Sequence, residues 1–442
     1  MTMQQKAERI FDHITAAGAE ADLMVNAQQS LSLKANKGEL EKYEVSSTQI
    51  FGLRVLQDGK VGLAYSEDDS AASLQSMAEQ ALSNAQFAAP DTNEQLLQNS
   101  AQLESDDAIL YLPDESTTDE KIDFILALES DLAAKAHIKN VPYNGVSDNT
   151  GERYIFSTSG LFAHSRGRSY TANAYALAEK GDANAMEGKG QFGRQFKQLN
   201  KDDLVQQIYD QCIAMLDGKP VASKHYDVIF DQECQSSLFG VFSAVFSGKW
   251  AKDGINPWRD SLGKVVADAR LQVFDNPLLQ AGSSYKTFDA EGSPTQRNVL
   301  INNGVLETLL HNSVTARFYG VENTANAVRG AKSALAVRMH QREIAAGDTS
   351  TANLQAGEFL EITHLAGLHS GADPISGDFS LGASGYLCRD GERVQAVRGI
   401  TVAGNFYTML NNIAAIGDTQ QWNWSKSALM PAIRFNALAI SG

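Results

Sequence analysis

The residues best placed to do chemistry lie at the start of a predicted helix in the stretch Tyr226–Trp250. Val228–Phe230 is a short apolar strand, and Asp231 follows it as a predicted helix N-cap. Glu233 falls in the first turn, where the helix dipole favours a carboxylate. Such a carboxylate acts as a general base if a water molecule or metal ion lies beside it. The simpler interpretation is that Glu233 only stabilises the helix dipole and has no role in catalysis.

His364 and His369 are the only close pair of histidines in the chain. On a strand, a separation of five puts the two side chains on opposite faces, so joint metal binding needs a turn at Gly367. With Asp373 and Asp378 as oxygen ligands, the two histidines are a candidate zinc site. We favour the alternative that they are structural histidines beside a loop at the end of a strand.

Other motifs are weak or missing. Gly188–Gly193 has the spacing GxGxxG, but polar residues precede it and no helix follows, so we expect a glycine-rich hairpin loop rather than a dinucleotide site. The chain has no HExxH, no GxSxG and no phosphate-binding loop of the GxxxxGK type. The segment Ser376–Ser380 (SGDFS) suits either a tight turn or a surface that binds peptide backbone.

The elements that must position these residues predict an α+β protein with three domains. We expect an N-terminal meander domain over residues 1–90, with order α-β-β-β-β-α and a type I′ turn at Asp58-Gly59. A polar connection follows. The central domain, residues 111–217, is expected to hold a helix with a Thr117–Glu120 capping box, a β-meander and a closing helix.

The third predicted domain, residues 225–442, is large and β-rich, with a hairpin at Asn303-Gly304. Its first helix is expected to bury one stripe and to end at Gly248. The stripe has the spacing i, i+3, i+4, i+7, i+8 and consists of Leu238, Val241, Phe242, Val245 and Phe246.

Composition narrows the classes of partner. The 442 residues carry 37 Lys and Arg against 53 Asp and Glu, and the net charge of −16 disfavours nucleic acids and anionic membranes. No apolar run approaches the ~20 residues of a membrane helix, and the first residues lack the apolar core of a signal peptide. Three widely spaced cysteines are typical of reduced thiols, so we expect a cytoplasmic protein.

Four segments together resemble the TldD/PmbA family, and in particular its PmbA branch, also called TldE. Glu291–Asn298 is similar to the family's EGxxTxR segment, and Asn323–Gly330 to its small-residue loop. His369–Ser380 resembles the GxNPxSGDFS segment, and the similarity continues through Gly399–Asn405.

The resemblance implies a cytosolic zinc metallopeptidase built from two related subunits, of which the TldD-type subunit carries HExxxH on the helix that opens its C-terminal domain. In this chain Gln232 and Ser237 stand where the two histidines would be, and Glu233 matches the glutamate. Without ligands there is no metal-bound water for Glu233 to activate. We therefore expect no catalytic residue and no metal in this chain, with the zinc held by the partner subunit.

The leading hypothesis is thus a PmbA/TldE-type subunit that completes the substrate channel of a TldD-type catalytic subunit in a heterodimer. Whether the isolated chain is an enzyme is left open; the complex is expected to be one. The family's substrates are unfolded or extended peptides, including modified-peptide precursors that lose a leader and an antitoxin. A homodimer of the isolated chain is compatible with the family's large pairing surfaces.

Candidate residues for binding substrate in this chain are Ser376, Gly377, Asp378, Phe379, Arg297 and Asn298. Extended peptides could also add to an exposed strand edge. The alternative function is a regulatory binding protein of the gyrase-modulator type, without a role in proteolysis.

Overall fold

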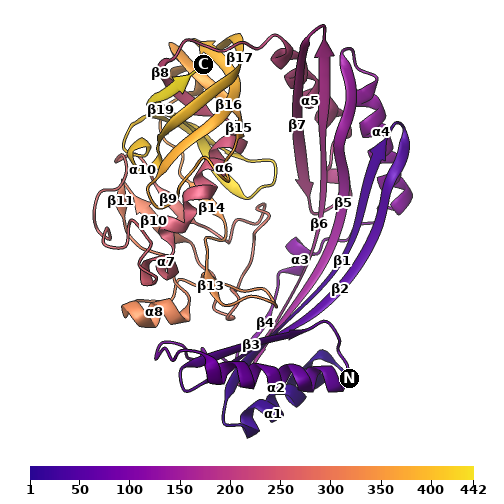
Figure 1. The fold of residues 1–442 in the computed structure, drawn as a ribbon, viewed down its shortest axis with the longest axis vertical. Coiled ribbons are helices and arrows are strands. Elements are labelled where there is room, and N and C mark those ends of the chain that lie inside the picture. The colour runs from indigo at the N-terminus through magenta and orange to yellow at the C-terminus, as the bar shows by residue number, and fades with distance from the viewer.

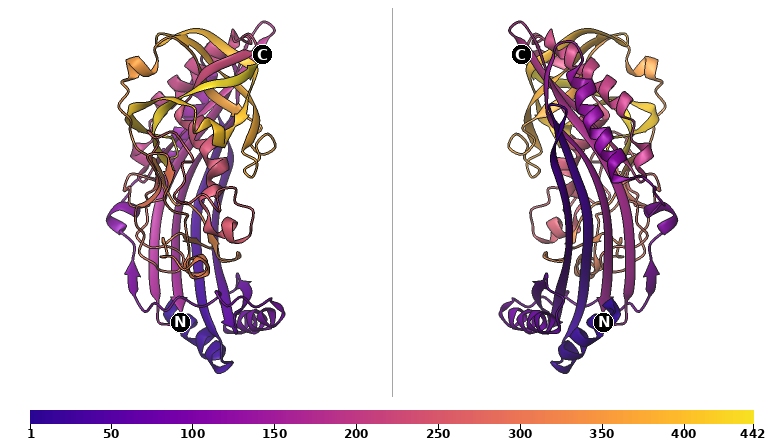
Figure 2. Two further views of the ribbon diagram at one scale, coloured as in Figure 1. Left: turned by 90° about the vertical axis from the view of Figure 1, so that its left-hand side faces the viewer. Right: turned by 90° about the vertical axis from the view of Figure 1, so that its right-hand side faces the viewer.

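A computed structural model describes all 442 residues. The chain forms two bodies side by side: a long twisted sheet with helices near its ends, and a β-rich C-terminal body that lies against one face of the sheet (Figure 1). In both side views the longest strands run most of the length of the molecule (Figure 2). No helix combines the length and the apolar character needed to cross a membrane.

The first body is built on one seven-stranded sheet of order β3-β2-β1-β5-β6, with β4 and β7 both pairing with β6. Its strands are β1 (Glu20–Asn36), β2 (Glu39–Gln57), β3 (Lys60–Ser66), β4 (Gln102–Glu104), β5 (Ile138–Ser157), β6 (Phe162–Lys180) and β7 (Ala183–Gly193). Because β1 pairs with both β2 and β5, residues of the predicted N-terminal and central domains share one sheet.

The strands are longer than the sequence predicts. In place of an expected meander of shorter strands, β1 and β2 form one continuous antiparallel hairpin. The polar residues Gln28–Ser30, which separate two expected strands, lie within β1 because the ladder of backbone hydrogen bonds continues through them. The type I′ turn at Asp58-Gly59 is confirmed, with φ of 53° and 74°.

Helices cover the two ends of this sheet, and their packing explains the two cores of the first body. The helices are α1 (Met3–Ala16), α2 (Ala71–Phe87), α3 (Asp107–Leu110), α4 (Thr118–Ala133), the 3₁₀ helix η1 (Phe196–Gln198) and α5 (Lys201–Leu216). α1 and α2 pack on β1–β3, whereas α4 and α5 pack on β5–β7. The predicted Thr117–Glu120 capping box at the start of α4 is confirmed.

The C-terminal body contains a ten-stranded sheet of order β11-β10-β9-β14-β19-β17-β16-β15-β8, with β18 paired to β19. Its strands are β8 (Lys224–Phe230), β9 (Val273–Asp275), β10 (Asn298–Asn302), β11 (Val305–Leu306), β14 (Arg342–Ile344), β15 (Glu358–Ala366), β16 (Asp378–Arg389), β17 (Glu392–Asn405), β18 (Ile413–Trp422) and β19 (Ala428–Ser441). The pair β12 (Ala327–Val328) and β13 (Ala336–Val337) stands apart from this sheet. The predicted hairpin at Asn303-Gly304 joins β10 to β11.

The helices of the C-terminal body are short: α6 (Gln232–Val241), the 3₁₀ helix η2 (Phe242–Phe246), α7 (Gly248–Lys252), α8 (Ser313–Tyr319), α9 (Thr351–Leu354) and α10 (Phe406–Met409). The single helix predicted to end at Gly248 is wrong. The α-helix ends at Val241, and Gly248 begins α7, which Ser247 caps by accepting a hydrogen bond from the Trp250 amide. The predicted stripe is still buried except at Val241, because the 3₁₀ turn keeps Phe242, Val245 and Phe246 against the core.

Candidate functional site

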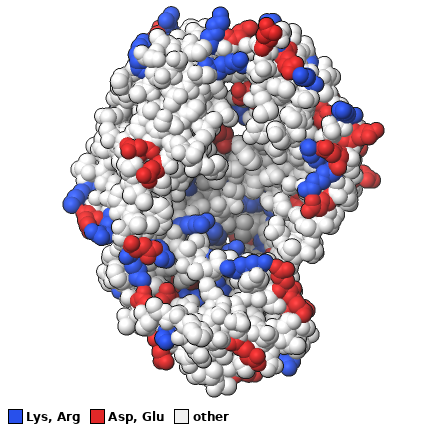
Figure 3. Space-filling view, viewed as in Figure 1, with Lys and Arg blue, Asp and Glu red and all other residues white.

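A groove separates strand β7 from the C-terminal body, and it is the first candidate for a functional site. β7 lies at an edge of its sheet and pairs with no strand other than β6. The space-filling view shows a deep hollow between the two bodies (Figure 3). An edge strand beside a groove offers unpaired backbone groups to an extended chain.

Three cavities meet along β7, and Lys189 lines each of them. Their volumes are about 640, 930 and 400 Å³. The Lys189 ammonium lies 3.6 Å from a carboxylate oxygen of Asp231, the N-cap of α6. The groove along β7 therefore passes directly over the start of α6, the place that the sequence singled out.

At the start of α6, Asp231 and Glu233 both have structural hydrogen-bond partners. Asp231 caps the helix by accepting a 2.8 Å hydrogen bond from the Cys234 amide. Glu233 accepts a hydrogen bond from the Trp424 amide, and burial raises the pKa of its carboxyl. The side-chain amide oxygen of Gln232 is buried without a hydrogen-bond partner.

This donor set does not fit a zinc ion. Gln232 and Ser237 supply neutral amide and hydroxyl oxygens, which are poor zinc ligands. The nearby thiol of Cys234 is buried, and burial raises its pKa well above the usual range, which opposes the thiolate form that binds metal. No three His, Cys, Asp or Glu side chains anywhere in the chain are placed to hold one metal ion.

His364 and His369, the alternative zinc candidates, do not converge with a third ligand. His364 lies on β15 and lines a cavity of the groove, where burial lowers its pKa. The chain turns at Gly367, as joint binding would require, and His369 follows in that turn. Neither histidine belongs to a group of ligands that converges on one point, and Asp373 and Asp378 do not complete one.

The SGDFS segment completes a tight turn at Ser376 and Gly377 and then begins β16 at Asp378, and it does not line the groove. Gly377 has φ of 87°, and a side chain there would lie 2.5 Å from the ring of Tyr407. The Asn405 amide donates hydrogen bonds to the Ser376 carbonyl at 2.9 Å and to the Asp378 carboxylate at 2.8 Å. Phe379 is buried in the core, so its side chain offers no surface to a peptide.

Arg297 and Asn298 also have partners within the fold. Arg297 forms a bidentate ion pair with Glu343, at 2.9 and 3.1 Å, and stacks on the ring of Phe274. Asn298 is buried and donates to the Thr324 carbonyl at 3.0 Å. None of the six residues predicted to bind substrate lines the cavities along β7, so the prediction and the groove lie in different places.

Sequence reasoning missed the groove because its wall was assigned to a hairpin loop. Gly188–Gly193 lies inside β7 instead. A side chain at Gly188 would lie 2.3 Å from the ring of Tyr175, and one at Gly190 would lie 2.9 Å from the ring of Trp424. Aromatic rings explain two of the three glycines in the GxGxxG spacing, and a side chain at Gly193 would lie 2.9 Å from Gln198. Glycines in a strand were the available signal of close approach.

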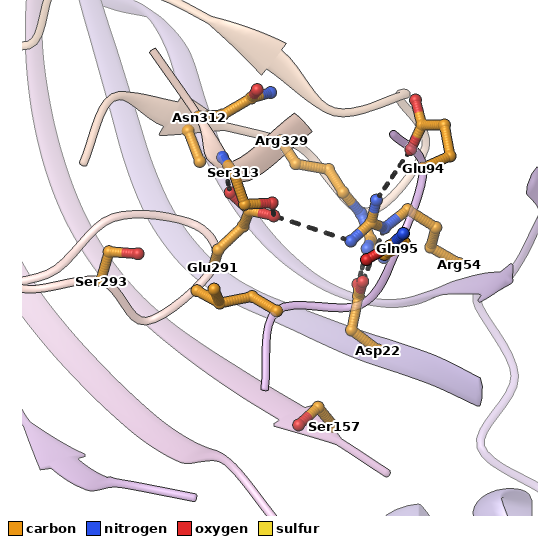
Figure 4. Close-up of polar contacts among 12 residues, drawn as sticks. Asp22, Arg54, Glu94, Gln95, Ser157, Glu291, Ser293, Asn312, Ser313 and Arg329 are labelled. Carbon is orange, nitrogen blue, oxygen red and sulfur yellow. Dashed lines mark hydrogen bonds and ion pairs between the residues drawn. The ribbon is translucent and has the colours of Figure 1, made fainter. Parts of the chain in front are cut away.

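The two bodies also meet at a buried ionic junction near the other end of the sheet (Figure 4). Asp22 on β1 accepts a 2.6 Å hydrogen bond from Arg54 on β2 and pairs with Arg329 of the C-terminal body. Arg329 also donates to the Gly52 carbonyl at 2.5 Å. Glu291 lies 3.9 Å from Arg54 and accepts two hydrogen bonds from Ser313. This junction fixes the C-terminal body to the sheet.

Taken together, the architecture is that of a two-body protein with a groove along an edge strand. The chain matches the PmbA/TldA metallopeptidase domain 1 over residues 21–85, the central domain over 111–216 and the C-terminal domain over 223–442. The chain therefore belongs to the PmbA/TldD family of metallopeptidases, as its sequence motifs suggested.

Individual relatives cover nearly the whole chain. A metalloprotease PmbA homolog of Haemophilus influenzae is 27% identical over 91% of this chain and 88% of its own length. Metalloprotease PmbA of Escherichia coli O157:H7 is 26% identical over 90% and 87%. A crystal structure of a proposed modulator of a DNA gyrase from Thermotoga maritima matches with a TM-score of 0.90 and 26% identity over all of both chains. A metalloprotease TldD homolog of Buchnera aphidicola is 26% identical over 39% of this chain and 36% of its own length.

Proposed function

We propose that this chain is the PmbA/TldE-type subunit of a heteromeric zinc metallopeptidase, in which a related TldD-type subunit holds the zinc. One observation carries the proposal: the start of α6 faces the groove with Gln232 and Ser237 in place of metal ligands. A subunit with the family fold and no ligand set contributes to peptide cleavage through binding rather than through chemistry of its own.

The groove along β7 suits an extended peptide. Its strand edge pairs with no other strand, and backbone hydrogen bonds to such an edge select extended chains with little regard to their sequence. We propose that an unfolded peptide lies along β7 and is delivered to the zinc of the partner subunit. Processing of modified-peptide precursors and turnover of an antitoxin are activities of this kind.

Metal analysis and a cleavage assay test the proposal together. The chain is purified alone and after co-expression with a TldD-type protein, and zinc content and cleavage of a disordered fluorogenic peptide are measured for each. We expect zinc and cleavage only in the complex, at one zinc per pair of subunits. Stoichiometric zinc and peptide cleavage by the chain alone would refute the proposal.

The catalytic subunit alone is the necessary control. If this chain completes the substrate channel, adding it should raise the cleavage rate of the TldD-type subunit and form a stable complex on size exclusion. An equal rate with and without this chain would show that it has no part in the channel.

A further inference from the structure

A separate cavity of about 360 Å³ lies between the middle of the long sheet and the loop 285–289 of the C-terminal body. It shares no lining residue with the three cavities along β7. Its polar lining includes Asn26, Arg153, Ser165, Arg166, Lys286 and Asp289. The space-filling view shows Lys and Arg atoms gathered inside the hollow between the two bodies (Figure 3).

Two cations in this cavity have no ionic partner. Arg153 makes one side-chain hydrogen bond, from its Nε to the Asn26 side chain at 3.2 Å, and lies within 4.0 Å of no carboxylate. The Lys286 ammonium makes neither an ion pair nor a hydrogen bond within the protein. Arg166, which lines the same cavity, differs because it pairs with Asp107 at 2.6 Å.

The acidic residues near these two cations accept hydrogen bonds from other groups. Asp275, which acts on Lys286, accepts from the backbone amides of His340 and Gln341 at 2.8 Å. The Asp289 carboxylate accepts hydrogen bonds from three backbone amides, those of Glu291, Ser293 and Ala327. Glu152 accepts a 3.0 Å hydrogen bond from the Tyr154 hydroxyl. In a chain of net charge −16, two cations without a carboxylate partner in one cavity are an unusual arrangement.

The surroundings of Lys286 oppose its positive charge. Burial and, to a smaller extent, the charge of Arg153 lower the pKa of Lys286 to about 8, against the opposing effect of the Asp275 and Asp289 carboxylates. The side chain of Arg153 keeps accessible surface inside the hollow, although the protein around it also lowers its pKa. Two like charges that repel each other in a sheltered cavity would both be stabilised by one bound anion.

We propose that Arg153 and Lys286 form a subsite for a carboxylate of a bound peptide. The planar guanidinium of Arg153 can hold a carboxylate with two parallel hydrogen bonds, and the ammonium of Lys286 adds a third donor. The carboxylate comes from an acidic side chain or from the C-terminus of the peptide. The peptide nature of this ligand rests on the proposed function.

The position of the subsite fits a peptide that also occupies the groove. Ser165 lines the subsite and Asn173 lines the groove, and both face the same side of β6 because their numbers differ by eight. Eight residues of an extended strand span about 26 Å. A peptide that reaches both sites therefore presents its carboxylate about eight residues from the start of α6.

Peptide binding to the isolated chain tests the subsite without a partner subunit. The probe is a fluorescein-labelled ten-residue peptide of Gly and Ser that ends in Asp-Asp with a free carboxylate, compared with one that ends in an Asn-Asn amide. We expect the acidic peptide to bind about tenfold more tightly, the usual gain from one charge-assisted contact. Added salt should reduce this preference.

Three variants locate the effect. Lys286→Met and Arg153→Gln should each reduce the preference to about twofold or less, whereas Lys264→Gln, an exposed lysine outside the cavity, should leave it unchanged. Because Lys286 has no partner to lose, Lys286→Met should melt at or above the temperature of the unaltered chain. Arg153→Gln serves as the second variant if Lys286→Met does not fold.

The outcomes separate this inference from the proposed function. The subsite is overturned if the unaltered chain binds both peptides equally, or if both variants keep the preference for the acidic peptide. The proposed function is decided separately, by the cleavage assay on the complex. Two further peptides show which carboxylate is bound. One ends in Asp-Asp amide and keeps only the side-chain carboxylates, and the other ends in Asn-Asn with a free C-terminus and keeps only the terminal carboxylate.

Discussion

The two bodies meet at one place through paired, buried charges and at another through accessible, unpaired ones. At the junction, Asp22 lies between Arg54 and Arg329, and all three side chains are nearly fully buried. Along the hollow, the exposed Arg153 and the half-buried Lys286 line a cavity without an ionic partner, and β7 offers an unpaired edge. The difference indicates that the junction holds the bodies together, whereas the hollow is kept available for something outside the chain.

The free-energy cost of burying an unpaired charge explains why the charges are paired at the junction and unpaired in the hollow. A buried arginine without a partner loses its hydration and gains nothing in return, so a closed junction needs a carboxylate for its cations. An accessible cation in a hollow keeps part of its hydration, so it persists unpaired at a smaller cost. Removing a charge from each region and comparing the losses in stability tests this difference.

The largest loss is expected from Asp22→Asn at the junction. The change leaves Arg54 and Arg329 buried with no shared carboxylate, and breaking one partner of such a network costs about 3–5 kcal/mol of the free energy of unfolding. Urea unfolding followed by tryptophan fluorescence measures the loss.

Glu67→Gln is the matched control, because Glu67 pairs with Lys332 across the same two bodies but both side chains are exposed. An exposed ion pair contributes about 1 kcal/mol or less. If Asp22→Asn costs no more than Glu67→Gln, burial of the junction is not what holds the two bodies together.

A smaller, pH-dependent effect is expected from Glu187 on β7. Burial raises the pKa of this carboxyl to about 7 from the model-compound value of 4.5. The folded chain therefore binds a proton that the unfolded chain has released between pH 4.5 and 7, and the free energy of unfolding falls as pH rises through this range. The loss reaches at most about 3 kcal/mol at pH 8.

Glu187→Gln removes this titration, so the variant should be more stable than the unaltered chain at pH 8 and show a flatter profile below pH 7. Thermal unfolding at intervals from pH 5 to pH 8 measures the profile. Asp182→Asn, in the exposed turn before β7, is the control and should leave the profile as it was. Parallel profiles for Glu187→Gln and the unaltered chain would show that β7 shields no carboxyl from water.

Features that depend on neighbouring residues were predictable from the sequence. The caps at Thr117 and Asp231 and the turns at Asp58-Gly59 and Asn303-Gly304 formed as expected, because each is set by a few adjacent side chains and backbone angles. The family and the α+β class were predictable as well, from motifs in the C-terminal third and from the mixture of patterns.

Features that depend on distant residues were not predictable. The single sheet shared by the first two predicted domains rests on the pairing of β1 with β5, whose residues are more than a hundred positions apart. Arg153 and Lys286 are likewise brought together only by the packing of the two bodies. The GxGxxG spacing misled because the aromatic rings that cover its glycines lie on other strands and loops.

The smallest effect, and the sharpest test of chemistry at the start of α6, is expected from Glu233. Its carboxylate accepts a hydrogen bond from the Trp424 amide, and the side-chain oxygen of glutamine can accept the same bond. Glu233→Gln should therefore change the free energy of unfolding by less than about 0.5 kcal/mol, and Glu233→Ala should lower it by about 1 kcal/mol. Urea unfolding of both variants measures the difference.

Cleavage by the complex with a TldD-type subunit then decides whether Glu233 has any role beyond that hydrogen bond. A general base contributes about 10² to 10⁴ in rate, and glutamine cannot replace it because an amide does not take up a proton near neutral pH. If Glu233 is structural, Glu233→Gln leaves the rate within about twofold, which is far below the range of a general base. A hundredfold loss would instead place catalysis at α6 of this chain, and the groove along β7 would then have chemistry of its own.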